Sequence, residues 1–212
     1  MVVAIDGPAG VGKSSVASYV ARQFGLFNLN SGSFYRAVAV KVMDEGADLE
    51  DVDAVVQCAE NAALDIRDGV LFLDGKAVEH RLRTDAVDHW SSVVSTIIPV
   101  RRAVNRHLRR IAGRIDLVAE GRDMTTVVFP SAEVKIFLDA DPAVRARRRH
   151  AQGTSTLSLE ELETSIRERD ERDRRKEEGA LTVAPDAVVI DTSALTLEQV
   201  CEKVSGLIKT YL

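Results

Sequence analysis

The segment Gly7-Pro-Ala-Gly-Val-Gly-Lys13-Ser14 fits the pattern G-x-x-x-x-G-K-[ST]. It follows a short apolar, mostly β-branched run at residues 2–5, which is typical of a buried parallel strand. It leads into a helical pattern over residues 13–24, which ends before Gly25. A strand, a glycine-rich loop and a helix in this order predict a loop that binds phosphate groups.

The residue types in this loop suit phosphate for separate physical reasons. Glycines let the backbone curl so that successive N–H groups point inward, and the following helix adds the positive end of its dipole. Lys13 can reach the β- and γ-phosphates of a nucleoside triphosphate, and the Ser14 hydroxyl can coordinate Mg²⁺. The motif therefore predicts binding of a nucleoside triphosphate without specifying the reaction.

The remainder of the chain alternates short apolar runs with helical patterns. Four further strands are expected at residues 26–29, 117–119, 134–138 and 188–190. Helices are expected at residues 31–43, 49–63, 85–96, 100–112, 142–149, 158–178 and 196–208, the last with a Thr196/Gln199 capping pattern. Five strands separated by helices predict an α/β fold with a doubly wound parallel sheet.

One stretch departs from this alternation. The segments Ala-Leu-Asp-Ile-Arg at residues 63–67 and Val-Leu-Phe-Leu at 70–73 flank Asp68-Gly69, which predicts a β-hairpin with a two-residue turn. Asp74-Gly75 is a second turn signal directly after it. Because a hairpin does not belong to a strand–helix alternation, we expect this stretch to lie in an inserted unit.

Charge is distributed unevenly along the chain. The net charge is −5, which argues against a general nucleic-acid binder. Of the 28 basic residues, 21 are arginine, and they gather at residues 101–114, 145–149 and 167–175. Biased codon usage can produce such an excess, but the planar fork of arginine also suits two phosphate oxygens at once. The arginine clusters of an acidic chain suggest a small anionic ligand held in a cleft.

Other features bound the class of protein. No apolar run approaches the ~18 residues that span a membrane, and the first residues do not resemble a secretory signal. Cys58 and Cys201 have neither metal-like spacing nor a disulfide framework, so we expect reduced thiols in a cytoplasmic protein. The Asn-Lys-x-Asp segment of GTPases is missing, and the chain is too short for most motor ATPases. Phosphoryl transfer to a second small molecule fits best.

Six segments in order over nearly the whole chain carry a resemblance to a known family. They are IDGPAGVGKSS (5–15), NSGSFYRA (30–37), EGRDMTTVVFP (120–130), VKIFLDADPAVRARRR (134–149), RERDERD (167–173) and DAVVIDTS (186–193). Together they resemble the bacterial cytidylate kinases. The resemblance implies a P-loop nucleoside monophosphate (NMP) kinase fold that transfers phosphate from ATP to CMP or dCMP with Mg²⁺.

The resemblance also assigns roles by motif position. It implies ATP contacts from Gly7, Pro8, Ala9, Gly10, Val11, Gly12, Lys13, Ser14 and Ser15, with Ser14 on the metal. It implies CMP contacts from Ser31, Gly32, Tyr35, Arg36, Ser92, Arg101, Arg122, Asp123, Arg169 and Asp173. The expected catalytic residues are Lys13, Arg36, Arg122 and Arg148.

Within this set the implied tasks differ. Arg36 and Arg122 would hold the acceptor phosphate, while Ser92, Arg101 and Asp123 would recognise cytosine. Arg169 and Asp173 would lie near the acceptor's ribose and phosphate, and Arg148 would approach ATP from the lid.

The sequence departs from the family pattern at four positions. Asn30 and Glu120 each replace a usual aspartate, and Thr125 replaces a usual glycine. Lys176 stands where the family has an arginine, and lysine cannot make the forked contact that arginine makes. Either Arg174, Arg175 or Lys176 substitutes, or the acceptor binds more weakly.

The family architecture implies three regions. The core is expected at residues 1–29, 113–150 and 177–212, the NMP-binding domain with its hairpin at 30–112, and a mobile lid at 151–176, where residues 153–157 form a polar break. The partners are expected to be small molecules only, with neither nucleic acid nor membrane, and the chain is expected to be a monomer. The alternatives are a kinase of UMP or AMP and a P-loop ATPase switch.

Taken without the resemblance, some of these residues allow simpler interpretations. Arg145 and Arg149 are four residues apart and could simply be exposed to solvent. Arg169 and Asp173 share one helix face and could form a structural pair. Asp6 could tie down the phosphate loop instead of contacting a ligand.

Overall fold

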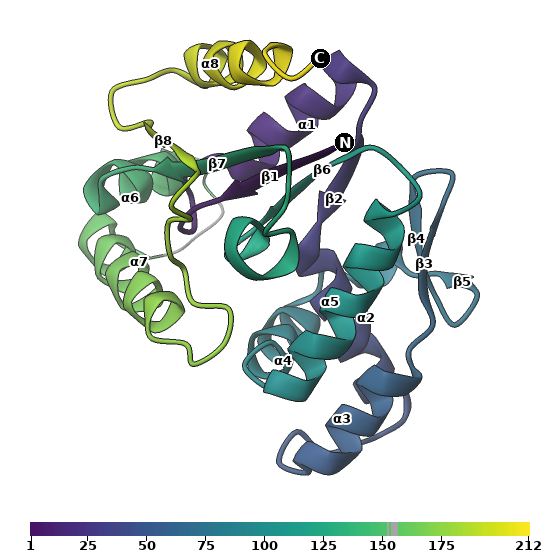
Figure 1. Ribbon diagram of the computed structural model, residues 1–212. Coiled ribbons are helices and arrows are strands. Elements are labelled where there is room, and N and C mark those ends of the chain that lie inside the picture. Colours follow the sequence, from purple (N-terminus) through teal and green to yellow (C-terminus); the bar gives the residue numbers. More distant parts are fainter. Residues whose placement is uncertain (152, 154–156) are drawn as a thin grey trace. The chain divides into compact units, whose positions relative to one another are not determined.

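The computed structural model describes residues 1–151, 153 and 157–212, and the chain forms two compact units (Figure 1). The first unit comprises Met1–Leu29 and Asp116–Leu212, and the second comprises Asn30–Ile115. The second unit is therefore an insertion between two strands of the first. Of the predicted lid segment at 151–176, residues 152 and 154–156 lie outside the described part of the chain.

The first unit is built on a five-stranded sheet. Its strands are β1 (Val2–Asp6), β2 (Phe27–Asn30), β6 (Leu117–Gly121), β7 (Val134–Asp139) and β8 (Val188–Asp191), in the order β2-β6-β1-β7-β8. The pairs β1–β6, β1–β7 and β7–β8 run parallel. Because central parallel strands are covered on both faces, β1 is apolar along most of its length. The predicted parallel α/β sheet is confirmed.

Helices complete this unit. They are α1 (Lys13–Phe24), α6 (Pro142–Ala151), α7 (Leu159–Arg174) and α8 (Leu197–Lys209), with a short π-helical segment η2 at Met124–Val128. Figure 1 shows α1 and α8 lying together beside the sheet. Val20 of α1 and Val204 of α8 join Val3, Ile5 and Ile136 of the strands in one apolar core. This core fixes the first turn of α1, and with it the end of the phosphate loop.

Helix α7 ends earlier than its charge pattern predicts. It begins at a capping box in which Ser158 and Glu161 each satisfy the other's backbone N–H. The expected end was residue 178, but the helix stops at Arg174. The backbone N–H of Leu181 donates to the Asp173 carbonyl at 2.8 Å, and the Leu181 side chain is buried. Burial of Leu181, seven residues after the end of the helix, thus overrides the local helical preference of residues 175–178. The capping box predicted for α8, with Thr196 and Gln199, is confirmed.

The second unit packs helices against a small antiparallel sheet. Its elements are α2 (Ser31–Asp44), α3 (Val52–Asn61), β3 (Leu64–Arg67), β4 (Val70–Leu73), β5 (Lys76–Ala77), η1 (Glu79–Arg81), α4 (Asp85–Val94) and α5 (Ile98–Ala112). Strands β3, β4 and β5 follow one another as two hairpins.

Both hairpin turns have the backbone that their sequences predict. Asp68 and Gly69 have φ of 49° and 80°, and Asp74 and Gly75 have φ of 50° and 78°. Two consecutive positive φ values match the twist of a hairpin, and aspartate followed by glycine tolerates them best. Within the described residues, no helix is both long and apolar enough to cross a membrane.

Candidate active site

The phosphate loop connects β1 to α1 and uses its glycines where a side chain would not fit. A Cβ added at Gly7 would lie 2.1 Å from the Leu138 carbonyl oxygen, so the loop runs directly against β7. Gly10 and Gly12 have φ of 76° and 99°, a backbone region that other residues rarely adopt. The loop conformation therefore requires glycine at all three positions.

Lys13 is buried across this loop. Its ammonium group donates to the carbonyl oxygens of Gly7 and Pro8, each at 2.8 Å. Burial holds the pKa of Lys13 well below its usual range, and the neighbouring Arg122 lowers it further. A desolvated cation that lies close to another cation binds an anion more strongly than a solvated lysine does.

Ser14 and Glu120 bring two oxygen donors together at the start of α1 and the end of β6. The Ser14 hydroxyl donates to Glu120 Oε2 at 2.9 Å, and Glu120 is buried. Glutamate at this position thus keeps a carboxylate next to the loop, although the family usually has aspartate.

Asp6 holds the segment that follows β6. Its carboxylate accepts hydrogen bonds from the backbone N–H groups of Met124 and Thr125 at 2.9 and 2.7 Å, and from the Thr125 hydroxyl at 2.7 Å. Burial raises the pKa of Asp6 against the effect of these bonds. The hydrogen bonds that involve Asp6 thus fix η2 rather than the phosphate loop, and Thr125 adds a contact that glycine could not make.

A second group of charges gathers on the same unit. Arg122 Nε donates to Asp173 Oδ2 at 2.9 Å, and Lys176 Nζ lies 2.8 Å from Asp173 Oδ1. Burial by itself raises the pKa of Asp173, but Arg122 and Lys176 hold it below its usual value. Burial lowers the pKa of Arg169, and so does Arg122. Arg122 and Arg169 also lower the pKa of Lys13, after the larger effect of burial.

The arginines at 145–149 occupy different environments. Arg148 donates to the hydroxyl and carbonyl oxygens of Thr192 at 3.1 and 2.6 Å, and to the Leu195 carbonyl at 3.3 Å. It therefore lies against the segment after β8. Arg145 is only 1% exposed, so its interpretation as a solvent-exposed residue is wrong, whereas Arg149 is exposed.

In the second unit, the segment at the start of α2 surrounds Arg36. Asn30 caps the helix by accepting from the Ser33 N–H at 3.2 Å, which an aspartate at this position could also do. A Cβ added at Gly32 would lie 3.0 Å from Asn30 Oδ1 and 3.4 Å from an Arg36 nitrogen. Arg36 Nε donates to Asp88 of α4 at 2.9 Å. The glycine leaves room for the arginine beside the cap.

Tyr35 and Arg101 lie together in this unit. The guanidinium carbon of Arg101 lies 5.5 Å from the centroid of the Tyr35 ring, and its NH1 donates to the Ser95 carbonyl at 3.0 Å. Both side chains are buried. The hydroxyl of Ser92 donates to the carbonyl of His89 in its own helix, at 2.7 Å. Asp123, the remaining predicted base-recognition residue, is buried in the first unit.

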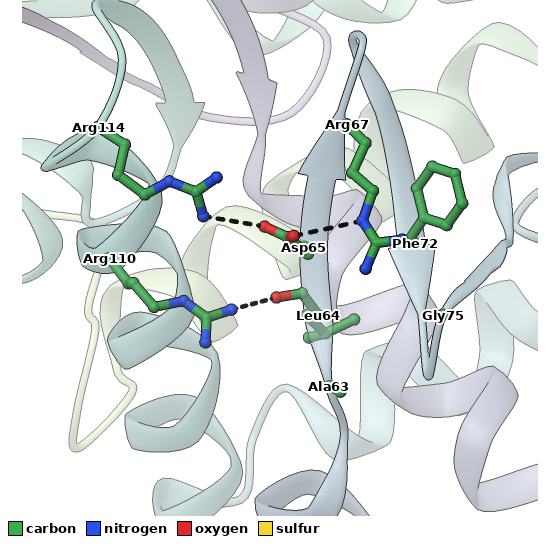
Figure 2. Close-up of a pocket in the computed structure, with 8 residues that line it drawn as sticks. All are labelled: Ala63, Leu64, Asp65, Arg67, Phe72, Gly75, Arg110 and Arg114. Atoms are coloured by element: carbon green, nitrogen blue, oxygen red, sulfur yellow. Dashed lines mark hydrogen bonds and ion pairs between the residues drawn. The ribbon is translucent and has the colours of Figure 1, made fainter.

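A separate cavity of about 270 Å³ lies beside the hairpin and is lined by arginines (Figure 2). Arg110 donates to the Leu64 carbonyl at 2.5 Å, and Arg114 and Arg67 lie 3.3 and 3.5 Å from the Asp65 carboxylate. The contacts of Arg110 and Arg114 fasten α5 and the segment directly after it to β3, and the contact between Arg67 and Asp65 lies within β3. None of the predicted site residues lines the cavity, so we give its arginines a structural role.

Sequence reasoning missed the partner of Arg145, which is Asp170 of α7. A signal for it exists, because Leu162, Ile166 and Asp170 follow one another at a spacing of four residues and all three are buried. A carboxylate that continues an apolar stripe needs a buried cationic partner.

Comparison with known proteins shows the family of the chain. The family model described as cytidylate kinase matches residues 3–210. The chain is 40% identical to the cytidylate kinase of Limosilactobacillus reuteri over 98% of this chain and 94% of that protein. It is also 40% identical to that of Vibrio cholerae over 100% of this chain and 97% of that protein. The crystal structure of shikimate kinase from Bacteroides thetaiotaomicron superposes with a TM-score of 0.52 at 11% identity, covering 100% and 97% of the two chains, and shows the fold alone.

Proposed function

Because the chain belongs to the cytidylate kinase family, we propose that it transfers a phosphoryl group from ATP to CMP or dCMP, giving CDP or dCDP. The observation that carries this proposal is that one unit holds two separate cationic groups. Lys13 crosses the phosphate loop, and Arg122, directly after β6, pairs with Asp173 on the helix that also carries Arg169. One cation in the loop serves a nucleoside triphosphate, and two further arginines suit a second phosphate. An ATPase switch has no need of the second set.

ATP would bind through the loop residues 7–15, with its β- and γ-phosphates at the loop N–H groups and Lys13. Arg148, which now contacts the segment after β8, would act from the ATP side. Ser14 and Glu120 supply oxygen atoms of the kind that Mg²⁺ prefers, and their 2.9 Å separation suits a shared ion. Mg²⁺ bound there would neutralise phosphate charge.

CMP would bind through the second unit and through Arg122, Asp123, Arg169 and Asp173 of the first. Arg36 and Arg122 would hold the acceptor phosphate. Tyr35 would support Arg101, which with Ser92 and Asp123 would recognise cytosine. In this proposal residues 30–112 act as the NMP-binding domain and residues 151–176 as the lid.

Little acid–base chemistry is needed, because the attacking phosphate oxygen of CMP is already an anion. The residues then have two tasks, which are to bring two anions into line and to neutralise the charge of the transferring group. Lys13, Arg36, Arg122 and Arg148 are the cations proposed for this. Closure of the lid would exclude water, which otherwise competes as the acceptor. A monomeric state and a cytoplasmic location stay predictions.

A coupled assay of ADP release tests the proposal with CMP, dCMP, UMP and AMP as separate acceptors. We expect CMP and dCMP to support turnover and to exceed UMP by at least ~10-fold in kcat/KM, the scale of one mismatched polar contact. Turnover with AMP alone, or ADP release that is the same without any acceptor, would contradict the proposal.

A further inference from the structure

The largest fully buried side chain of the described residues is a charged one, Arg145. It lies near the start of α6 and makes hydrogen bonds to three segments of the first unit. Nε donates to the Ala140 carbonyl at 2.9 Å, at the end of β7, and NH1 donates to the Ala9 carbonyl in the phosphate loop at 3.1 Å. NH1 also donates to Asp170 Oδ1 in α7 at 3.1 Å, and NH2 donates to Asp170 Oδ2 at 2.5 Å.

We infer that Arg145 and Asp170 are positioning residues for phosphoryl transfer. They hold the phosphate loop and helix α7 in a fixed position relative to each other. The inference rests on the proposed function and extends it to two residues that touch neither nucleotide in that proposal. Arg145 is the centre of the link and Asp170 is its attachment to α7.

The first half of the link concerns the phosphate loop. A peptide unit is planar and trans, so the N–H of Gly10 points away from the carbonyl of Ala9. By holding that carbonyl, Arg145 directs the Gly10 N–H to the opposite side, which is the side available to a phosphate. The contact is close, because a Cβ added at Gly10 would lie 3.7 Å from the Cβ of Arg145. An N–H group fixed in advance binds an anion without the cost of ordering the loop.

The second half concerns α7, which carries two of the proposed CMP contacts. Asp170 directly follows Arg169 and precedes Asp173 by three residues, so it fixes the rotation of the helix that presents both. Burial lowers the pKa of Arg169 and the charge of Arg122 lowers it further, while Arg122 and Arg169 both lower the pKa of Lys13. Arg122 pairs with Asp173 of the same helix, but through one nitrogen only. The bidentate Arg145–Asp170 pair, one residue along from Arg169, adds a contact that ties α7 to α6 and to the phosphate loop.

Stability alone does not require this pair. Removing two charges from water costs as much as their attraction returns, and a well-packed apolar pair often replaces a buried ion pair without loss of stability. Helices α6 and α7 already share an apolar contact through Ala146, Leu162 and Ile166. The ion pair adds a fixed orientation of α7 relative to α6, since its hydrogen bonds form in only one arrangement.

The test exploits this difference with the double variant Arg145→Met/Asp170→Leu. We expect its melting temperature to stay near that of the wild type, while kcat for CMP falls by roughly 10- to 100-fold, as when a reacting group is misplaced by about 1 Å. The Kd for ATP, measured by calorimetry without CMP, should weaken by about 10-fold. The matched control is Glu202→Leu/Lys203→Met, which makes similar substitutions at two exposed positions of α8 and should change neither value.

Arg145→Lys covers the case in which the double variant does not fold, because lysine keeps the charge but cannot form the fork. It should lose kcat in the same range at temperatures where it is fully folded. A folded double variant or Arg145→Lys variant with wild-type kcat and ATP affinity overturns the inference. If the wild type itself does not phosphorylate CMP, the proposed function fails, and the ATP affinities still decide whether Arg145 holds the phosphate loop.

Discussion

The two units hold their key charges in opposite ways. In the first unit Arg145 and Lys13 are 1% and 7% exposed and bind backbone carbonyls of the phosphate loop and its surroundings. In the second unit the side chain of Arg36 is 34% exposed, and that of its partner Asp88 is 56% exposed. A buried, multiply bonded cation cannot move without breaking the fold around it. An exposed ion pair is worth only ~0–1 kcal/mol and exchanges readily for a phosphate.

This contrast separates two kinds of contribution to catalysis. Charges that are fixed in advance stabilise mainly the transition state, so a substitution that removes one should lower kcat. Other charges leave a surface ion pair to bind the ligand. A substitution that removes such a charge should mainly raise the KM for that ligand. Variants in the two units therefore test whether the contrast governs function.

The largest loss is expected from Lys13→Ala in the first unit. The lysine is a point charge at the transferring phosphate, so kcat should fall by more than ~10²-fold, the cost of removing one preorganised donor. The fold should persist, because burial of this charge does not favour the folded state. Lys203→Ala, on the exposed side of α8, is the control. Near-wild-type turnover of Lys13→Ala would refute its assignment.

The counterpart in the second unit is Arg36→Ala. Loss of a charge-assisted contact of ~1.5–3 kcal/mol should raise the KM for CMP by roughly 10- to 100-fold, with a smaller effect on kcat. Asp88→Asn should alter KM by less than ~3-fold, since the exposed pair contributes little. Steady-state kinetics with varied CMP measure both. A fall in kcat at unchanged KM for Arg36→Ala would contradict the prediction that the charges of the second unit act mainly on KM.

A smaller effect concerns base choice at Asp123. The carboxylate can accept from the amino group of cytosine but meets another acceptor at O4 of uracil, which is costly for a buried group. An asparagine can donate to O4 as well as accept from an amine. Asp123→Asn should therefore narrow the ~10-fold preference for CMP over UMP. If the ratio of kcat/KM values for the two acceptors is the same in the variant, Asp123 does not read the base.

The smallest effect is expected at Lys176, which touches Asp173 through a single ammonium group. An arginine there could hold both Asp173 and a phosphate through its fork, as the family residue would. Lys176→Arg should lower the KM for CMP by about 3-fold, a fraction of one charged hydrogen bond. Arg175→Lys is the control, since Arg175 is exposed and pairs with Glu171. An unchanged or higher KM for Lys176→Arg would show that the lysine is already an adequate replacement.

What could be predicted from the sequence was the structure that depends on neighbours in the chain. The phosphate loop and the two Asp-Gly turns follow from backbone preferences at consecutive residues, and the strands from short apolar runs. The link between Arg145 and Asp170 joins residues 25 positions apart, and only the packing of α6 on α7 brings them together. The end of α7 at Arg174 was missed for the same reason, because the burial of Leu181 decides it.

The structure bears on the roles that the family resemblance implies only through the positions of the residues. The structure brings Arg122, Arg169 and Asp173 together in one unit, and Tyr35 and Arg101 in the other. Departures from the family pattern find local explanations at Asn30, which caps α2, and at Thr125, which binds Asp6. The Asn30 cap is a local contact of a kind that capping preferences predict. The Thr125 contact could not be predicted in this way, because its partner Asp6 is placed by the fold.

Transfer of labelled phosphate tests the central claim most directly. The protein is incubated with ATP that carries an isotopic label on its γ-phosphate, with and without CMP, and the products are separated. The account predicts that the label appears in CDP in an amount equal to the ADP formed, and that little ADP forms without CMP. Label recovered as inorganic phosphate at the same rate in both reactions would show an ATPase, and would contradict the account.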